Sequence, residues 1–140
     1  MRTVLLILLL AVCTESISYS SSGQKTVGGI KTAVSAQELL KITGASSKFV
    51  YYDLRTYLEY SIVHVPKSIN LPMQYLKNRM DEIGGHDEII LIANDEKEAA
   101  LASQMIKSRY PDKTIRFLGG GIGSWINAGY PIQNEIPHGC

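Results

Sequence analysis

The chain has 140 residues, and its 14 Lys and Arg residues against 13 Asp and Glu residues give a formal net charge of +1. This length fits one domain with one hydrophobic core. The near-neutral charge and the lack of a basic cluster argue against binding to nucleic acid, because nucleic-acid-binding proteins usually carry a clustered basic face. We therefore expect a single globular domain with no nucleic-acid partner.

Residues 1–22 have the pattern of a secretory signal peptide. A positive charge at Arg2 precedes the continuous apolar run of residues 4–12, which is too short to span a bilayer as a helix. The alternative is a lipoprotein signal with a lipid anchor at Cys13, which the bulky residue before that cysteine disfavours. We expect an exported protein, periplasmic or secreted, with no membrane span in the mature chain.

The mature chain is expected to hold one cysteine, because Cys13 lies in the predicted signal peptide and Cys140 is the last residue. No internal disulfide is therefore expected, and packing has to hold the core together. Residues 17–30 are rich in Ser, Gly and Thr, a composition typical of linkers, and a flexible linker is expected at 23–32. The folded domain is predicted for residues 33–134, with a C-terminal tail at 135–140.

The first helix of the domain is expected to begin after Ser35 and to end at Gly44. Ser35 as N-cap and Glu38 three residues later form the pattern of a capping box. The β-rich run 49–52 predicts a strand that ends at the polar turn Asp53-Leu54-Arg55. The acid and the base of this turn can form a buried ion pair.

The middle of the domain is predicted to contain one helical turn, a short strand and an amphipathic helix. The helical turn is expected at 56–60, and the short strand stops at Pro72. The amphipathic helix is expected at 73–83 and is closed by Gly84 and Gly85. Its apolar side chains recur three and four residues apart: Leu76, Met80 and Ile83.

Residues 88–93 form the most apolar stretch of the mature chain, and their lack of alternation predicts a central strand covered on both faces. A helix at 99–110 and a strand at 114–118 follow. The three glycines at 119–121 predict a tight turn that needs positive φ, and Trp125 after them is expected in the core. The helix is expected to place three apolar residues on its inner face: Leu101, Met105 and Ile106.

Strands and helices alternate along the whole domain, which predicts an α/β sandwich with a mostly parallel sheet. Right-handed crossovers place the loops after the strands at one edge of the sheet, where open α/β sheets usually bind ligands. The loop after the central strand, residues 93–98, is therefore the candidate site. The three histidines are isolated from each other and from acids at ligand spacing, so neither a metal nor a cofactor is expected. They are His64, His86 and His138.

Three stretches resemble motifs of the rhodanese-like (sulfurtransferase) family. The turn Asp53-Leu54-Arg55 matches the D-x-R turn of that family. Residues 59–72 are similar to its E-Y-x-x-G-H-I-P-G-A-I-N-I-P segment, with Val63 and Lys67 at the two glycine positions. Residues 118–131 resemble its closing L-x-G-G-x-x-x-W-x-x-x-G-x-P. In this order and spacing the motifs are specific, and together they cover nearly the whole predicted domain.

The resemblance implies a three-layer sandwich whose five-stranded sheet is flanked by helices. It also implies a catalytic cysteine at the end of the central strand, whose thiolate is stabilised by a six-residue loop and carries sulfur as a persulfide. In this sequence that position falls on Ala93, and residues 94–98 complete the loop. A methyl group cannot take up sulfur. The three acids and one lysine of the loop also disfavour an anion such as thiosulfate.

Two interpretations of the degenerate loop are open. Asp95 as N-cap and Glu98 at the third helical position can form a capping box that starts the next helix. Alternatively, the loop is adapted to bind a cation or a basic segment of a partner. The residues concerned are Ala93, Asn94, Asp95, Glu96, Lys97 and Glu98.

Outside the loop, Arg55 and His64 each have a functional and a structural interpretation. Through the D-x-R turn of the family, Arg55 could line a ligand pocket; an ion pair with Asp53 or another acid is the structural alternative. His64 matches a position that is mainly structural in the family, so we expect a satisfied, partly buried side chain.

The sequence thus predicts an exported rhodanese-like domain that is not an enzyme and acts as a binding or scaffolding module. Its partner would be an unknown protein or a small ligand. The alternative is a sulfurtransferase or sulfur carrier that uses Cys140 as its persulfide carrier. A terminal thiol without a neighbouring cation has no feature in the sequence that lowers its pKa, which disfavours this alternative.

Overall fold

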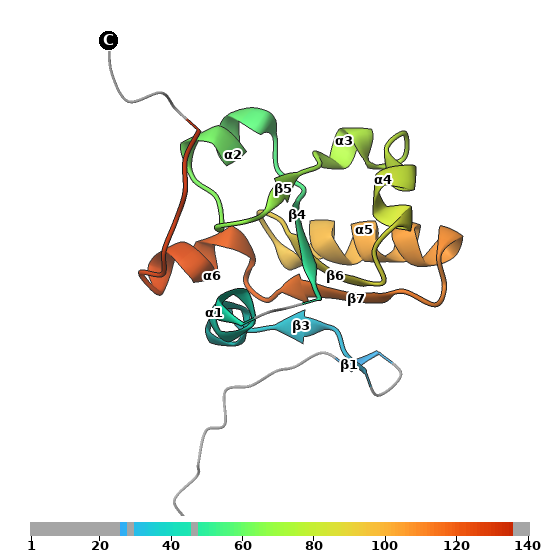
Figure 1. Ribbon diagram of the computed structural model, residues 1–140, viewed down its shortest axis with the longest axis horizontal. Helices are drawn as coiled ribbons and strands as arrows, with labels where there is room; N and C mark the ends of the chain where they lie inside the picture. The colour runs from blue at the N-terminus through green and yellow to red at the C-terminus, as the bar shows by residue number, and fades with distance from the viewer. Residues whose placement is uncertain (1–25, 28–29, 46–47, 136–140) are drawn as a thin grey trace, which may run out of the picture.

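The structure is a computed structural model, and it describes residues 26–27, 30–45 and 48–135 (Figure 1). The strands are β1 (Thr26–Val27), β2 (Ile30–Lys31), β3 (Ala33–Val34), β4 (Val50–Asp53), β5 (Ile69–Asn70), β6 (Glu88–Ile92) and β7 (Thr114–Leu118). The helices are α1 (Ala36–Gly44), α2 (Tyr57–Ile62), α3 (Met73–Leu76), α4 (Met80–Gly84), α5 (Glu96–Arg109) and α6 (Gly121–Asn127). The predicted signal peptide, the alternative lipid anchor at Cys13 and the alternative sulfur carrier Cys140 lie outside the described residues.

The main sheet has five strands in the order β3-β7-β6-β4-β5, and every neighbouring pair in it is parallel. β6 lies in the middle, where Ile89 is opposite Val50 of β4 and Ile115 of β7. The predicted α/β fold with a mostly parallel sheet is therefore confirmed. Because the strands run in one direction, the loops that follow them all leave the sheet at the same edge, the carboxyl edge.

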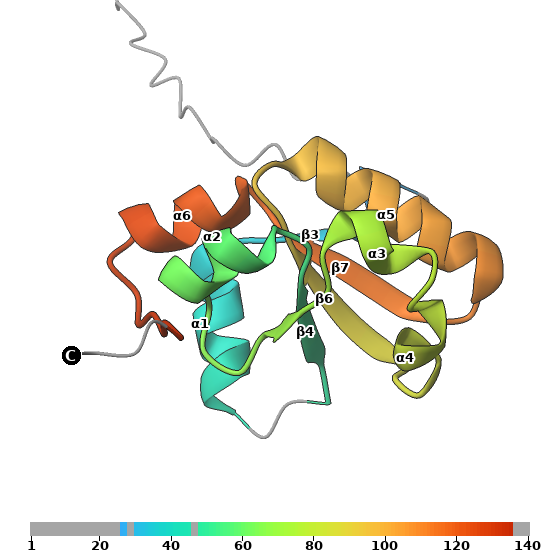
Figure 2. The same cartoon turned by 90° about the horizontal axis from the view of Figure 1, so that it is seen from above.

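Helices cover both faces of the sheet and make the three layers that Figure 2 shows. Ile89 and Leu91 of β6 pack on the face covered by α3, α4 and α5. Ile90 and Ile92 pack on the opposite face, which α1 and α6 cover. Successive side chains of a strand point to opposite faces. A strand covered on both sides therefore needs the continuous apolar run by which the sequence predicted it.

The amphipathic helix predicted at 73–83 is wrong in one respect, because it is broken into α3 and α4. The N–H groups of Asn78 and Arg79 both donate to the carbonyl of Tyr75, which tightens the turn after α3. Arg79 then leaves helical geometry, at φ −108 and ψ 19, while its guanidinium pairs with Glu82 in α4. The predicted apolar residues are nevertheless buried, so the periodicity located the inner face but not the break.

The predicted inner face of α5 is also partly wrong. Leu101 is 53% exposed, whereas Ala99, Ala102 and Ile106 are buried against the sheet. Positions 99, 102 and 106 follow the helical repeat and lie on one face, and two of them are alanines that let α5 approach the strands closely. Leu101 lies on another side of the helix. The size of Leu101 was therefore a poor guide to its position, because two of the three buried positions of α5 are alanines.

A short hairpin lies within the range predicted as a flexible linker, 23–32. Thr26 pairs with Lys31 and Val27 with Ile30 in an antiparallel sheet separate from the main one. β-Branched residues on both sides of two glycines are a known hairpin signal, which the composition of this segment obscured. Within the described part of the chain, no helix has the length and apolar character needed to cross a membrane.

Candidate functional site

The candidate loop lies in the middle of the carboxyl edge. It leaves β6 at Ala93, whose side chain is 1% exposed, and enters α5 at Glu96. In Figure 2 the end of β6 and the first turns of α2, α5 and α6 come together at this edge. The carbonyl of Ala93 accepts a hydrogen bond from the N–H of Ile122 at 2.9 Å, which ties the loop to α6. The position after the central strand is therefore buried and fixed from both sides.

The loop is a helix start closed by its own carboxylates. Oδ1 of Asp95 accepts hydrogen bonds from the N–H groups of Lys97 at 2.8 Å and Glu98 at 2.9 Å. Oε2 of Glu98 accepts from the N–H of Asn94 at 3.4 Å. The predicted N-cap at Asp95 is thus present, but Glu98 reaches back to Asn94 instead of Asp95. Three N–H groups that could face an anion are bonded to acids of the same loop.

Two further hydrogen bonds join the loop to its neighbours. The side-chain amide of Asn94 donates to Oε1 of Glu59 in α2 at 2.9 Å. Oε1 of Glu96 accepts from the N–H of Gly120, before α6, at 2.9 Å. Glu59 also completes the capping box of α2 with Thr56. The contacts of Glu59 and Gly120 were not predicted from the sequence, although the Thr-x-x-Glu spacing that starts at Thr56 is a capping-box signal.

The glycine turn before α6 packs tightly against the loop. Gly120 and Gly121 have φ of 73 and 62, so the predicted turn with positive φ is confirmed. A Cβ at Gly121 would lie 2.3 Å from the carbonyl oxygen of Asn94 and 2.8 Å from that of Ala93. Only a residue without a side chain fits so close to another backbone. This contact holds the backbone of the candidate loop in place.

The two glutamates that contact Asn94 have opposite pKa shifts. Burial raises the pKa of Glu98, and the negative charges of Asp95, Glu59 and Asp53 raise it further, against the lowering effect of the Asn94 N–H. Hydrogen bonds from Thr56 and Asn94 lower the pKa of Glu59. Asn94 therefore contacts one carboxylate that is stabilised as an anion, Glu59 of α2, and one that is not, Glu98 of the loop.

Arg55 is buried in the turn after β4, where it is 4% exposed. Its Nη2 lies 2.7 Å from Oδ2 of Asp53 and also donates to the carbonyl of Val63 at 2.7 Å. Its Nε donates to Oδ1 of Asp53 at 3.0 Å. The buried ion pair predicted for this turn is present. The other interpretation, that Arg55 lines a ligand pocket, stays a prediction.

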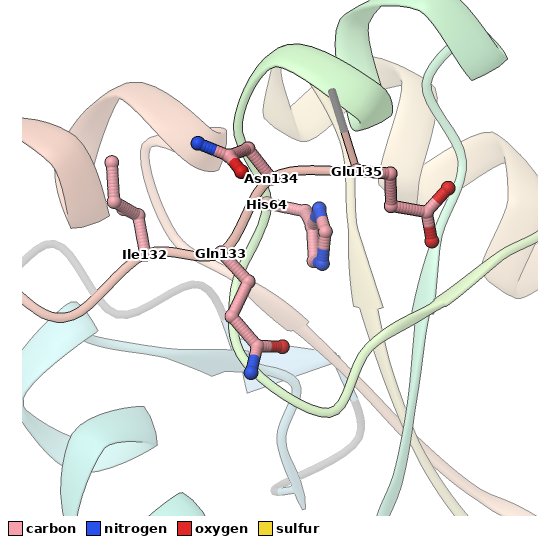
Figure 3. Close-up of a pocket in the computed structure, with 5 residues that line it drawn as sticks. All are labelled: His64, Ile132, Gln133, Asn134 and Glu135. Atoms are coloured by element: carbon pink, nitrogen blue, oxygen red, sulfur yellow. The ribbon is translucent and has the colours of Figure 1, made fainter. Parts of the chain in front are cut away.

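His64 lies beneath the segment that follows α6. It is buried, its Nδ1 lies 2.8 Å from the carbonyl of Tyr60, and its ring stacks on the ring of Tyr60 at 3.9 Å. Its backbone forms an antiparallel bridge with Gln133. A shallow hollow lies here, but the labelled side chains around it point in different directions (Figure 3). His64 therefore has the satisfied, structural setting that the sequence predicted.

Trp125 of α6 is fully buried, as predicted. Its Nε1 donates to the carbonyl of Pro131 at 2.8 Å, and its ring meets the ring of Tyr130 edge-on at 5.2 Å. Buried indole N–H groups usually find such an acceptor. Trp125 thus anchors the segment after α6 to the core and contributes nothing to the carboxyl edge.

A hollow of about 460 Å³ lies beside the candidate loop. Asp95, Glu96 and Lys97 line it from the loop, and Ala100 and Phe117 line it from α5 and β7. The loop offers methyl, amide, carboxylate and ammonium groups, none of which is a thiol, hydroxyl or imidazole. Among the described residues, no three His, Cys, Asp or Glu side chains come together as a metal site. The arrangement can accept hydrogen bonds and attract positive charge.

Known proteins are similar in sequence to this domain. Residues 35–128 match the rhodanese-like domain family. The chain is 31% identical over 97 residues to the adenylyltransferase and sulfurtransferase MOCS3 of Drosophila persimilis, which covers 62% of this chain and 22% of that protein. It is 26% identical over 113 residues to an HTH-type transcriptional regulator of Mycobacterium tuberculosis, which covers 81% of this chain and 50% of that protein. The chain spans half or less of the length of these relatives.

Solved structures share the fold. The thiosulfate sulfurtransferase from Pseudomonas aeruginosa matches with a TM-score of 0.65 at 20% identity, over 74% of this chain and 20% of that chain. The rhodanese-like domain of an Anabaena protein matches with a TM-score of 0.64 at 18% identity, over 79% of this chain and 88% of that chain. Sequence and architecture agree, and the chain belongs to the rhodanese-like domain family.

Proposed function

We propose that this chain is a non-catalytic rhodanese-like domain that acts as a binding module. The observation that carries the proposal is the use of the loop N–H groups. The N–H groups of Asn94, Lys97 and Glu98 are bonded to carboxylates of the same loop, at distances from 2.8 to 3.4 Å. A loop that stabilises a persulfide or binds thiosulfate has to offer such groups to the sulfur or the anion. Here they are already occupied.

The residue at the end of the central strand supports the same proposal. By resemblance to the family, the catalytic cysteine would lie at Ala93, and the nearest loop residues, Ile92 and Asn94, are not nucleophiles either. Two relatives differ in function, since one is an adenylyltransferase and sulfurtransferase and the other is a transcriptional regulator. Fold does not imply function, so the activity has to be argued from the site. In this site we find no group to carry sulfur.

Charge gives a further reason against an anionic substrate. Asp95, Glu96 and Glu98 lie within one turn of the helix start, and Glu59 adds a fourth carboxylate through its contact with Asn94. Lys97 is the cation of the loop. Like charges repel at short range, most strongly where water is excluded. An anion such as thiosulfate would meet this repulsion before it reached the backbone.

The direct test is sulfur transfer from thiosulfate to cyanide by the purified chain. We expect no turnover above a buffer blank, for the wild type and for Cys140→Ser alike. Turnover that persists in Cys140→Ser would contradict the proposal. Turnover that disappears in Cys140→Ser would also contradict it, and would establish the alternative in which the terminal thiol carries the sulfur.

A second test asks whether the loop itself prevents catalysis. Ala93→Cys supplies a thiol but leaves the N–H groups occupied, so we expect little or no turnover from this variant. Adding Asp95→Gly and Glu98→Ala frees those N–H groups and should raise both turnover and the rate of alkylation of the new thiol by iodoacetamide. Ala93→Ser in the same background is the matched control. Strong turnover in Ala93→Cys alone would show that the carboxylates are no obstacle.

Export belongs to the same proposal. The charge at Arg2 and the apolar run at 4–12 support a signal peptide, which would make this a module of the periplasm or the extracellular space. Expression of the chain with a C-terminal reporter, followed by N-terminal sequencing of the product, tests this. We expect cleavage between Cys13 and residue 23. An uncleaved cytoplasmic product would contradict it.

A further inference from the structure

The carboxyl edge carries exposed apolar side chains next to its carboxylates. Leu58 in the first turn of α2 is 69% exposed, and Tyr57 beside it is 64% exposed. Their neighbour Glu59 contacts Asn94, so the first turn of α2, which carries both residues, lies next to the candidate loop. On the other side, Leu101 stands one helical turn after Lys97 in α5 and is also exposed. Three large exposed apolar residues thus lie on helical turns next to the acidic helix start.

The hollow beside the loop combines the same two properties. Its apolar part is formed by Ala100 and Phe117, and its rim carries the acids Asp95 and Glu96 with one cation, Lys97, in the first turn of α5. We group the hollow with the three exposed apolar residues of the neighbouring helical turns and call them the loop surface. Its members are Tyr57, Leu58, Asp95, Glu96, Ala100 and Leu101. An apolar area rimmed by polar groups is typical of a site that binds another protein.

The carboxylates of the loop surface keep free acceptor capacity. Among the described residues, Asp95 is contacted only through Oδ1 and Glu96 only through Oε1. The second oxygen of each remains open to a ligand, and both side chains are exposed. A carboxylate can accept several hydrogen bonds, and those from Arg or Lys are the strong ones. The charge complementary to this surface is therefore positive.

We propose that the loop surface binds a short segment of a partner protein in which basic residues alternate with large apolar residues. The apolar side chains would cover Leu58 and Leu101 and enter the hollow, while the cations would meet Asp95 and Glu96. This inference rests on the proposed function, because it assigns the partner of the same site. It goes further by fixing the chemistry of that partner.

A second copy of the chain is a poorer occupant than a separate protein. Every arginine in the described part of the chain is already in an ion pair. The pairs are Arg55–Asp53, Arg79–Glu82, Arg109–Asp81 and Arg116–Glu38. A second copy would have to break one of these pairs to offer a guanidinium to the loop surface, and otherwise could offer only lysines. A partner segment with unpaired arginines has no such cost, and arginine, unlike lysine, can bind a carboxylate with two parallel hydrogen bonds.

The test uses a short, acetylated and amidated peptide in which Arg and Leu alternate, with Arg→Glu and Leu→Ser versions as controls. Binding is measured by fluorescence anisotropy, and the site is mapped by NMR chemical-shift changes on the full chain. We expect saturable binding of the Arg–Leu peptide alone, with shifts at residues 56–59 and 94–101. Equal binding of a control peptide, shifts elsewhere, or no saturable binding would each overturn the proposal.

Variants assign the binding to its residues without breaking the helix cap. Asp95→Asn with Glu96→Gln removes both charges but keeps oxygen acceptors for the N–H groups, and should weaken binding about fivefold. The matched control, Asp81→Asn with Asp112→Asn, removes two charges at the opposite edge and should change binding less than about twofold. If the control weakens binding as much as the test pair, the proposal is wrong.

The apolar contribution has its own pair of variants. Leu58→Ala should weaken peptide binding about threefold, because it removes an exposed side chain that the peptide would cover. Ile132→Ala, at a similarly exposed apolar residue in the segment after α6, should have no effect. Sedimentation of the wild type without peptide tests the other occupant. Self-association that Leu58→Ala abolishes would assign the surface to a second copy and overturn the proposal.

The outcome is separable from that of the proposed function. The sulfur-transfer assay is run on the same protein sample that is titrated with peptide. Absence of both turnover and peptide binding would overturn only the partner assigned here. Turnover would overturn the non-catalytic function itself, whatever the peptide does.

Discussion

Two turns at the carboxyl edge use acids in opposite ways. The turn after β4 buries Asp53 completely and matches it with Arg55, which is also buried. The turn after β6 leaves Asp95 exposed and matches it with the N–H groups of Lys97 and Glu98. Both turns follow buried strands of one sheet. They differ in whether a fixed cation or the backbone satisfies the carboxylate.

The difference shows which turn is structural and which one keeps an exposed negative charge. A buried carboxylate needs a fixed cation, because an unpaired charge in the interior is costly. An exposed carboxylate bonded to N–H groups at a helix start is only modestly stabilising. It also keeps its charge and an open oxygen. The first turn should therefore fail when its pair is broken, and the second should tolerate neutral substitutes.

The largest expected effect is at the buried pair. Arg55→Met leaves Asp53 buried without its cation and should lower the free energy of unfolding by about 3 to 5 kcal/mol. Arg79→Met removes a similar pair that is exposed, and should cost less than about 1 kcal/mol. Urea unfolding of both variants measures the difference. Equal decreases in the free energy of unfolding would show that burial does not increase the contribution of the Asp53–Arg55 pair to stability.

The next effect is at the contact that fixes the loop after β6. Gly121→Ala puts a Cβ against the carbonyl of Asn94 at a residue with φ of 62, and should destabilise by about 2 kcal/mol or more. Gly123→Ala, in the same helix with open space around it, should stabilise by up to about 1 kcal/mol. Thermal unfolding followed by circular dichroism compares them. A neutral Gly121→Ala would mean that the loop backbone shifts easily.

A smaller effect is expected at the cap of α5. Asp95→Ala removes the acceptor for two N–H groups and should cost about 1 kcal/mol, whereas Asp95→Asn, itself a good N-cap, should cost only a few tenths. Chemical denaturation distinguishes the two. A loss in Asp95→Asn as large as that in Asp95→Ala would show that the charge of Asp95, and not its acceptor oxygen, holds the helix start.

The smallest effects concern the titration of the two glutamates that contact Asn94. Carboxyl NMR should show Glu98 titrating above, and Glu59 below, the ordinary range of a glutamate. For Glu59 the folded pKa is lowered, so its contribution to stability is present above the unfolded pKa and is lost as the pH falls through the folded pKa. For Glu98 the folded pKa is raised, so its ionisation costs stability, and this cost disappears as the pH falls. Titration in the reverse order would contradict the assigned hydrogen bonds.

Much of the fold followed from local patterns. The continuous apolar run before Ala93 identified the central strand, the three glycines identified the turn before α6, and Asp53 with Arg55 identified a buried pair. Each of these signals lies within a few neighbouring residues. The break between α3 and α4 and the exposure of Leu101 could not be found in this way, because they depend on which neighbour each helix packs against.

The local features of the candidate site were likewise predictable from the sequence, and its long-range contacts were not. The sequence by itself determined that the end of β6 carries Ala93 followed by an acidic helix start, because residue types and spacing are local properties. Only the tertiary structure decided which distant groups this loop contacts: Glu96 accepts from Gly120, and Asn94 donates to Glu59 of another helix. Hydrogen bonds between elements distant in the chain depend on how the sheet brings their ends together. No spacing along the sequence encodes them.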